Sequence, residues 1–213
     1  MTTEITKTNT EGESSIYRNP DSFEFAQRQA KSLCTSTLVP PSYQGQEGLP
    51  NCLVALEMSK RMNLSPLTVM QNLNVIHGRP SWSAQFITSI IIGCDRFKNF
   101  DYVVEGSGES LSVQCTAIRL EDNKLVKGTA VTMKMARSEG WTKNPKYTSM
   151  PDLMLRNRAA TFFGRQYIPD LLLGVQTSEE VIDIEPEPIN VSESLDFREQ
   201  KKPKQEDNDD NQF

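Results

Sequence analysis

Apolar residues recur at helical spacing in several separate stretches of the chain. This period predicts a helix from residue 21 or 22 to about 37, and further helices over about 50–62, 66–73 and 83–93. The loop between the first two holds two prolines and two glycines, and Asn63–Pro66 separates the next two. The first helix fits either a core helix or a mobile arm that contacts a neighbouring subunit. Residues 83–93 are too apolar for a surface helix, so we expect them to pack under a sheet.

Between residues 99 and 134 the apolar residues fall close to every second position, which is typical of strands with one solvated face. We expect three strands, over about 101–105, 111–118 and 125–135, with turns at Gly106–Gly108 and Asp122–Asn123. A separate hairpin is predicted at His77–Gly78, between Asn74–Ile76 and Ser81–Trp82. These patterns predict an α+β fold in which a small antiparallel β-meander packs with several α-helices.

The longest predicted helix ends at Tyr167 and begins near Pro151, which suits a first helical turn. Ser149 is a candidate N-cap. Because a helix turns roughly 100° per residue, Arg158 and Arg165 lie on one stripe. This stripe either offers two guanidinium groups to consecutive phosphates or is a solvated cationic face over an apolar core.

Charge is distributed unevenly along the chain. The formal net charge is −5, but the segment from residue 185 to residue 213 alone carries nine acids and four bases. Residues 124–165, in contrast, contain nine bases and two acids. A ligand meets this local field and not the total, so the central segment fits a polyanion such as nucleic acid.

The chain is expected to have a folded core between two disordered ends. Residues 1–20 are polar, and residues 185–213 are highly charged and lack apolar periodicity. We therefore predict a disordered N-terminal arm over 1–20, a core domain over 21–184 and an acidic disordered tail over 185–213. No apolar run is long enough to span a membrane and no secretory signal core is present, which favours a cytoplasmic protein.

Two blocks of the sequence resemble the RecT/Redβ family of phage single-strand annealing proteins. The first comprises Met150-Pro151, Met154-Leu155-Arg156, Arg158-Ala159 and Arg165, and the second is MNLSPLTVMQNLNVIHGRPSW at 62–82. The resemblance extends over about residues 23–183. Asp152 departs from the pattern, since the family has a lysine just after the proline, and Asn63 replaces a usual glycine.

The resemblance implies an ATP-independent protein that binds single-stranded DNA and the nascent annealed duplex in a basic groove of an oligomeric ring or helical filament. It implies backbone contacts by Arg158 and Arg165, and a phage exonuclease and a host single-stranded DNA-binding protein as partners in a bacterial cytoplasm. Tyr147, between two lysines, supplies a ring on which a base could stack. The residues expected to bind nucleic acid are Arg79, Lys127, Lys134, Arg137, Lys143, Lys146, Tyr147, Arg156, Arg158 and Arg165.

Several of these residues also have a purely structural interpretation. Arg79 is either a phosphate contact at a hairpin tip or an exposed turn charge, and the strand lysines are either a binding surface or a solvated sheet face. An alternative function is a passive single-stranded DNA-binding protein whose acidic tail recruits repair proteins.

The sequence contains few motifs that indicate catalysis or cofactor binding. The sequence shows no nucleotide-binding loop, no metal-spaced carboxylate set and no nucleophile–His–acid set, and it has one histidine. Its four cysteines are widely spaced and are expected to be buried free thiols. We therefore expect a protein that is not an enzyme and that needs no cofactor or metal.

Overall fold

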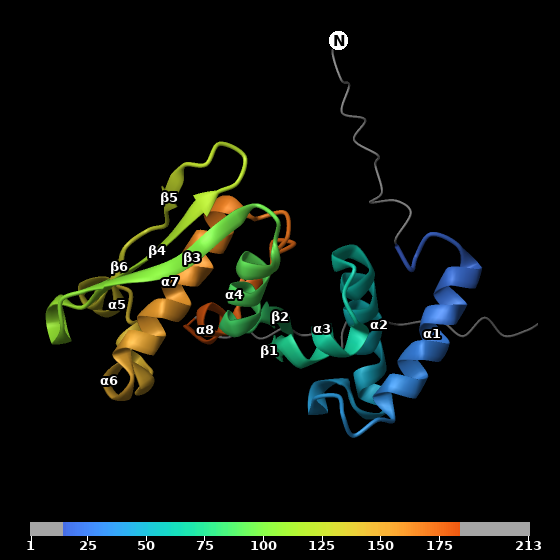
Figure 1. Cartoon of the computed structure of the whole chain (residues 1–213). Helices are drawn as coiled ribbons and strands as arrows, with labels where there is room; N and C mark the ends of the chain where they lie inside the picture. Colours follow the sequence, from blue (N-terminus) through green and yellow to red (C-terminus); the bar gives the residue numbers. More distant parts are fainter. Residues whose placement is uncertain (1–14, 184–213) are drawn as a thin grey trace, which may run out of the picture.

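A computed structural model describes residues 15–183 and shows an α+β fold. A group of helices lies to one side of a central hairpin, and a larger antiparallel sheet with its covering helices lies to the other (Figure 1). One continuous cluster of buried apolar side chains runs through both parts, from Ile16 to Leu172. Within the described residues, no helix has the length and apolar composition needed to cross a bilayer.

The helical part contains α1 (Pro20–Cys34), the 3-10 turn η1 (Pro41–Tyr43), α2 (Gly45–Met62) and α3 (Pro66–Asn72). The first helix begins one or two residues before the predicted start, because the side chain of Asn19 accepts a hydrogen bond from the amide of Ser22. Asn63 ends α2 in the left-handed conformation, with φ 51°. Residues 15–20 were assigned to a disordered arm, which is wrong for this part of it. Ile16 is buried, and its amide donates to the Glu57 carboxylate.

The loop predicted over residues 45–48 is instead the start of α2, and Pro50 lies inside this helix. Gly48 is buried and makes this possible, because a Cβ atom there would lie 2.2 Å from the carbonyl carbon of Tyr43. The hydroxyl of Tyr43 donates to the carbonyl of Leu73 at 2.6 Å, so the same residue links the start of α2 to the hairpin. A close backbone approach of this kind leaves no periodic signal in the sequence.

Replacing Gly48 with alanine is expected to lower the free energy of unfolding by about 1–3 kcal/mol, since the methyl group overpacks a contact with backbone that has little freedom to shift. Gly93→Ala is the matched control. It also lies in a helix, but its Cβ would meet nothing within 4 Å, so stability should hold or rise by up to about 1 kcal/mol. Urea unfolding of both variants measures the difference, and equal stabilities would contradict the close approach.

The predicted hairpin is confirmed as β1 (Leu73–Ile76) and β2 (Arg79–Trp82), with His77 and Gly78 at positive φ in the turn. A two-residue strand that was not predicted, β7 (Gln176–Thr177), pairs in parallel with β2. Residues 169–174, which lie between α7 and β7, form turns.

The meander consists of β3 (Phe97–Glu105), β4 (Ser112–Arg119), β5 (Leu125–Lys127) and β6 (Val131–Thr132), with the 3-10 turn η2 (Gly108–Ser110) after β3. The single return strand predicted over 125–135 is wrong, because it is broken at Gly128. A Cβ atom there would lie 3.2 Å from the ring of Phe163, and the Gly128 amide donates to the Cys115 carbonyl at 2.8 Å. Thr132 then caps the next helix and ends β6.

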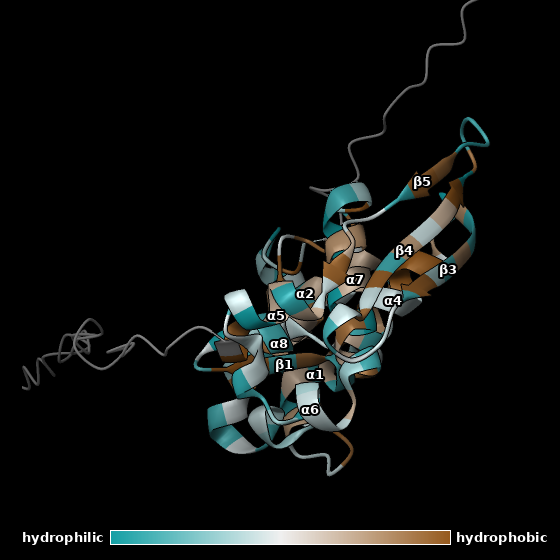
Figure 2. Cartoon of the chain, turned by 90° about the vertical axis from the view of Figure 1, so that its left-hand side faces the viewer, coloured by the Kyte–Doolittle hydropathy of each residue, from teal (hydrophilic) through white to brown (hydrophobic). Residues whose placement is uncertain are grey.

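Two helices, α4 (Ala84–Gly93) and α7 (Pro151–Tyr167), cover one face of this sheet. Phe163 of α7 lies against both Phe97 and Phe100 of β3, with ring centroids 5.3 and 5.5 Å apart. The other face is uncovered, as the alternating pattern predicted, although Val103 and Leu125 on this face are apolar and exposed. Figure 2 shows apolar segments along β3, β4 and β5 and a hydrophilic turn between β4 and β5.

The connection from the sheet to α7 holds three short helical segments: α5 (Met133–Ser138), η3 (Trp141–Lys143) and α6 (Lys146–Ser149). They lie on the side of the molecule away from α1 (Figure 1). Ser149 belongs to α6 and does not cap α7, since Met150 occupies the N-cap position. The chain then passes through β7 to α8 (Ser178–Asp183). The acidic tail and residues 1–14 lie outside the described residues.

Candidate nucleic-acid interface

Four of the ten expected DNA-binding residues are exposed lysines, Lys127, Lys134, Lys143 and Lys146. None of them pairs with an acid between residues 15 and 183. Three lie on the α5–η3–α6 connection, and Lys127 ends β5. An unpaired surface ammonium keeps its full charge for a ligand, so this connection is the most cationic exposed part of the candidate interface.

Three arginines of the set are exposed or half-buried and already pair with acids. Arg137 bonds to Glu109, Arg156 to Asp152 at 2.8 Å and Arg165 to Glu180 at 2.7 Å. The guanidinium of Arg156 also lies 5.1 Å from the ring centroid of Tyr102. The pairs of Arg137 and Arg156 are partly or largely exposed, and such pairs contribute only about 0–1 kcal/mol, so a phosphate can compete for these two arginines. The Glu180 side chain is only 10% exposed and accepts two further hydrogen bonds, so Arg165 is held more firmly.

Asp152 stands where the resembled family has a lysine, and this substitution changes the charge at the start of α7. It places a carboxylate one turn before Arg156 and neutralises the first turn of α7. An internal ion pair therefore stands at the position where the resembled family has a lysine.

Arg158 does not face the solvent beside Arg165, so the expectation that both meet consecutive phosphates is wrong. Arg158 is 3% exposed, and its guanidinium carbon lies 4.3 Å from the ring centroid of Trp141. Its Nε donates to the Tyr147 hydroxyl at 3.2 Å and its Nη2 to the Glu179 carbonyl at 3.3 Å. Arg158 and Arg165 lie on the same side of α7, as predicted, but η3, α6 and α8 cover this side at Arg158.

The ring of Tyr147 is not available to a base, which corrects the expectation of stacking. It is 2% exposed, and its centroid lies 6.4 Å from that of Trp141. Trp141 is itself buried and lies against Phe162, so it anchors the loop. The lysine-bearing connection is thus attached to α7 through aromatic side chains that point inward.

Arg79 is half-buried on the hairpin strand β2, opposite Ile76, and has no acid partner within the described residues. It belongs to a different part of the structure from α5, η3 and α6. The structure therefore groups Lys134, Arg137, Lys143 and Lys146 on one connection, and leaves Arg79 outside that group.

The acids that pair with the predicted cations were missed from the sequence. Glu180 accepts from the amide of Thr177 and its hydroxyl, both at 2.9 Å, which makes Thr177 and Glu180 part of a capping arrangement for α8. The spacing Thr-x-x-Glu was visible in the sequence and is the known signal for such a cap. Neither the pairing of Glu180 with Arg165 nor that of Glu109 with Arg137 left a local signal.

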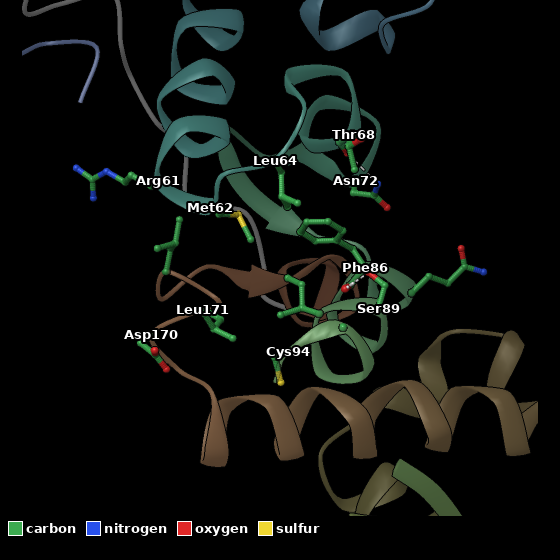
Figure 3. Close-up of a pocket in the computed structure, with 14 residues that line it drawn as sticks. Arg61, Met62, Leu64, Thr68, Asn72, Phe86, Ser89, Cys94, Asp170 and Leu171 are labelled. Carbon is green, nitrogen blue, oxygen red and sulfur yellow. Dashed lines mark hydrogen bonds between the residues drawn. The ribbon is translucent and has the colours of Figure 1, made fainter. Parts of the chain in front are cut away.

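A hollow of about 590 Å³ lies between the end of α2, α3, α4 and the turn after α7 (Figure 3). Its lining is mainly apolar and includes Met62, Leu64 and Phe86, with Cys94 at one side. None of the ten candidate residues lines it. The hollow and the cationic connection are therefore separate features of the molecule.

Two of the four thiols, Cys52 and Cys115, are poorly suited to nucleophilic chemistry. Burial raises the pKa of Cys52 to about 11 and that of Cys115 to about 12, so both are protonated at neutral pH. All four cysteines are free, as expected, although Cys94 is only half-buried. Between residues 15 and 183 no three histidine, cysteine or acidic side chains form a group that could hold a metal ion.

No family model, curated protein or solved structure matches the chain.

Proposed function

We propose that this chain is an ATP-independent single-strand annealing protein, which binds single-stranded DNA and the newly annealed duplex. The observation that carries the proposal is the exposed lysine group on α5, η3 and α6, in which no ammonium is neutralised by an acid of residues 15–183. The sequence resemblance to the RecT/Redβ family adds the reaction class and the Redβ-like annealing core.

A surface of lysines is sufficient for this reaction. Pairing of complementary strands lowers the free energy and needs no catalytic group. The protein must reduce the repulsion between two phosphate backbones and leave the base edges accessible. Flexible ammonium groups contact phosphates without reading sequence. Affinity for a single strand then falls with salt at a log–log slope of about 0.7 per phosphate contacted.

The burial of the aromatic rings favours annealing over passive single-strand binding. Passive binders hold bases by stacking them on exposed aromatic side chains. Among the phenylalanine, tyrosine and tryptophan residues of 15–183, only Tyr17 and Phe25 are more than half exposed, and both lie in or beside α1. Bases held near Lys143 and Lys146 would therefore stay free to pair.

One subunit offers only a few phosphate contacts, so we propose that the protein works as a ring or helical filament in which the cationic surfaces of neighbouring subunits form one groove. Arg137 and Arg156 would join this groove by exchanging their exposed acid partners for phosphates, and the exposed side of Arg165 would contact a phosphate while the residue keeps its pair with Glu180. A phage exonuclease and a host single-stranded DNA-binding protein are the partners that the resemblance implies.

Sequential addition of two complementary oligonucleotides tests the annealing proposal. We expect the complex formed in this way to survive salt concentrations that release a single strand, because two phosphate backbones contact the protein. Fluorescence anisotropy with a labelled first strand measures retention, and a preformed duplex is the control. Equal affinity for the single strand, the annealed product and the preformed duplex would remove the annealing claim. Tight single-strand binding with slowed pairing would instead indicate the passive binder.

A further inference from the structure

Three parts of the chain meet at the buried guanidinium of Arg158. One face of the guanidinium lies over Trp141 of η3, at 4.3 Å from the ring centroid. Its edge donates to the hydroxyl of Tyr147 in α6 at 3.2 Å and to the carbonyl of Glu179 in α8 at 3.3 Å. A planar cation with several fixed donors can make these contacts together, whereas an ammonium group has neither the plane nor the spacing.

Two of the exposed lysines, Lys143 and Lys146, lie within two residues of the two rings in this cluster. Lys143 follows Trp141 by two residues in the same 3-10 turn, and Lys146 precedes Tyr147. In each case the ring points into the protein and the lysine points out. The position of both lysines relative to α7 therefore depends on how firmly Trp141 and Tyr147 are held.

Backbone hydrogen bonds shape this segment and link only its end to α7, where the amide of the N-cap residue Met150 donates to the carbonyl of Lys146 at 2.8 Å. The amide of Lys143 donates to the carbonyl of Gly140 at 3.2 Å, and that of Tyr147 to the carbonyl of Asn144 at 3.0 Å. Both bonds are local to the turn. Side-chain contacts such as those of Arg158 must therefore fix the segment against the long helix.

We propose that Arg158 is a positioning residue for DNA binding: it holds the segment 141–147 so that Lys143 and Lys146 are presented to the phosphate backbone at a fixed spacing. This inference rests on the proposed function. Preorganised groups lose less conformational freedom on binding, so loss of the anchor lowers affinity even though Arg158 touches no phosphate. The buried arginine thus acts through the two lysines.

Amide hydrogen exchange of Arg158→Lys tests the anchoring without DNA. We expect the amides of residues 141–150 to exchange at least about 10-fold faster, while those of β4 keep their protection. Arg119→Lys is the control, since Arg119 forms an ordinary surface pair with Asp122. If Arg158→Lys does not fold, Tyr147→Phe removes a single partner of the guanidinium and should loosen the same amides to a smaller degree. Unchanged exchange over 141–150 in a folded variant would overturn the anchoring.

A double-mutant cycle tests whether the anchor acts through the lysines. Arg158→Lys is measured alone and in the background Lys143→Gln/Lys146→Gln, by anisotropy with a labelled single strand. We expect a loss of affinity of about 5–10-fold alone and less than about twofold in the double background. Equal losses in both backgrounds would show a general structural role and overturn the proposal. If the unaltered protein binds no single strand, the proposed function and the DNA role of Arg158 both fail, and hydrogen exchange alone decides the anchoring.

Discussion

Replacing Lys143 and Lys146 together with glutamate is expected to weaken binding to single-stranded DNA by at least about 25-fold at ~0.1 M salt. Each lost phosphate contact removes about 0.7 decade of affinity at ~0.1 M salt, because fewer counterions are released on binding, so two lost contacts account for about 25-fold. The two new carboxylates add repulsion from the phosphates. Because both side chains are exposed and without an acid partner in residues 15–183, the fold should not change.

The control for this prediction is Lys31→Glu/Lys60→Glu, on the exposed surfaces of α1 and α2. Both double variants change the formal net charge from −5 by the same four units, to −9. If a long-range electrostatic field drives DNA binding, both double variants should bind more weakly to a similar degree. If a local interface drives it, only Lys143→Glu/Lys146→Glu should lose affinity. Anisotropy titrations at several salt concentrations separate the two, and equal losses would show that the α5–η3–α6 connection is not the contact surface.

The helices and the hairpin could be predicted because their signals are local. The start of α7 follows from Pro151, and the turn of the hairpin follows from His77–Gly78, whose positive φ angles suit the two-residue turn. The covered face of the meander follows from alternation along β4. Each of these features depends on residues that are close in sequence and on one dominant physical constraint.

The environment of Arg158 could not be predicted in this way. A helical wheel gives the direction of a side chain, but it does not show which other element lies there. Trp141 and Tyr147 come from the preceding connection, and the Glu179 carbonyl comes from α8, which begins after the turns at 169–174 and a two-residue parallel strand. The break at Gly128 has the same origin, since it depends on the approach of Phe163 from α7.

These tertiary contacts give the candidate arginines and lysines different roles. Arginine, which suits both stacking and bidentate bonds, is used here for internal contacts at Arg156 and Arg158. The charges left free at the surface of the connection are lysines. A surface of this kind is expected to hold phosphates loosely and without sequence preference, as the proposed annealing reaction would require.

Replacing Phe163 with alanine is expected to lower the free energy of unfolding by about 3–5 kcal/mol. Phe163 is 0% exposed, and its ring lies within 5.5 Å of the rings of Phe97, Phe100 and Tyr167, measured between centroids. It also fills the space that Gly128 leaves open. Removing it creates a cavity where α7 joins the sheet, and neighbouring rings can close such a cavity only in part.

Phe25→Ala is the matched control, because it removes the same side chain from a helix, α1, in which Phe25 is 52% exposed. Its loss should cost about 1 kcal/mol or less, since roughly half of the side chain stays in water in the folded state. Urea unfolding followed by circular dichroism measures both variants. If the two substitutions cost the same, α7 is not packed on the sheet through Phe163, and the attachment of the lysine-bearing connection to a fixed helix loses its basis.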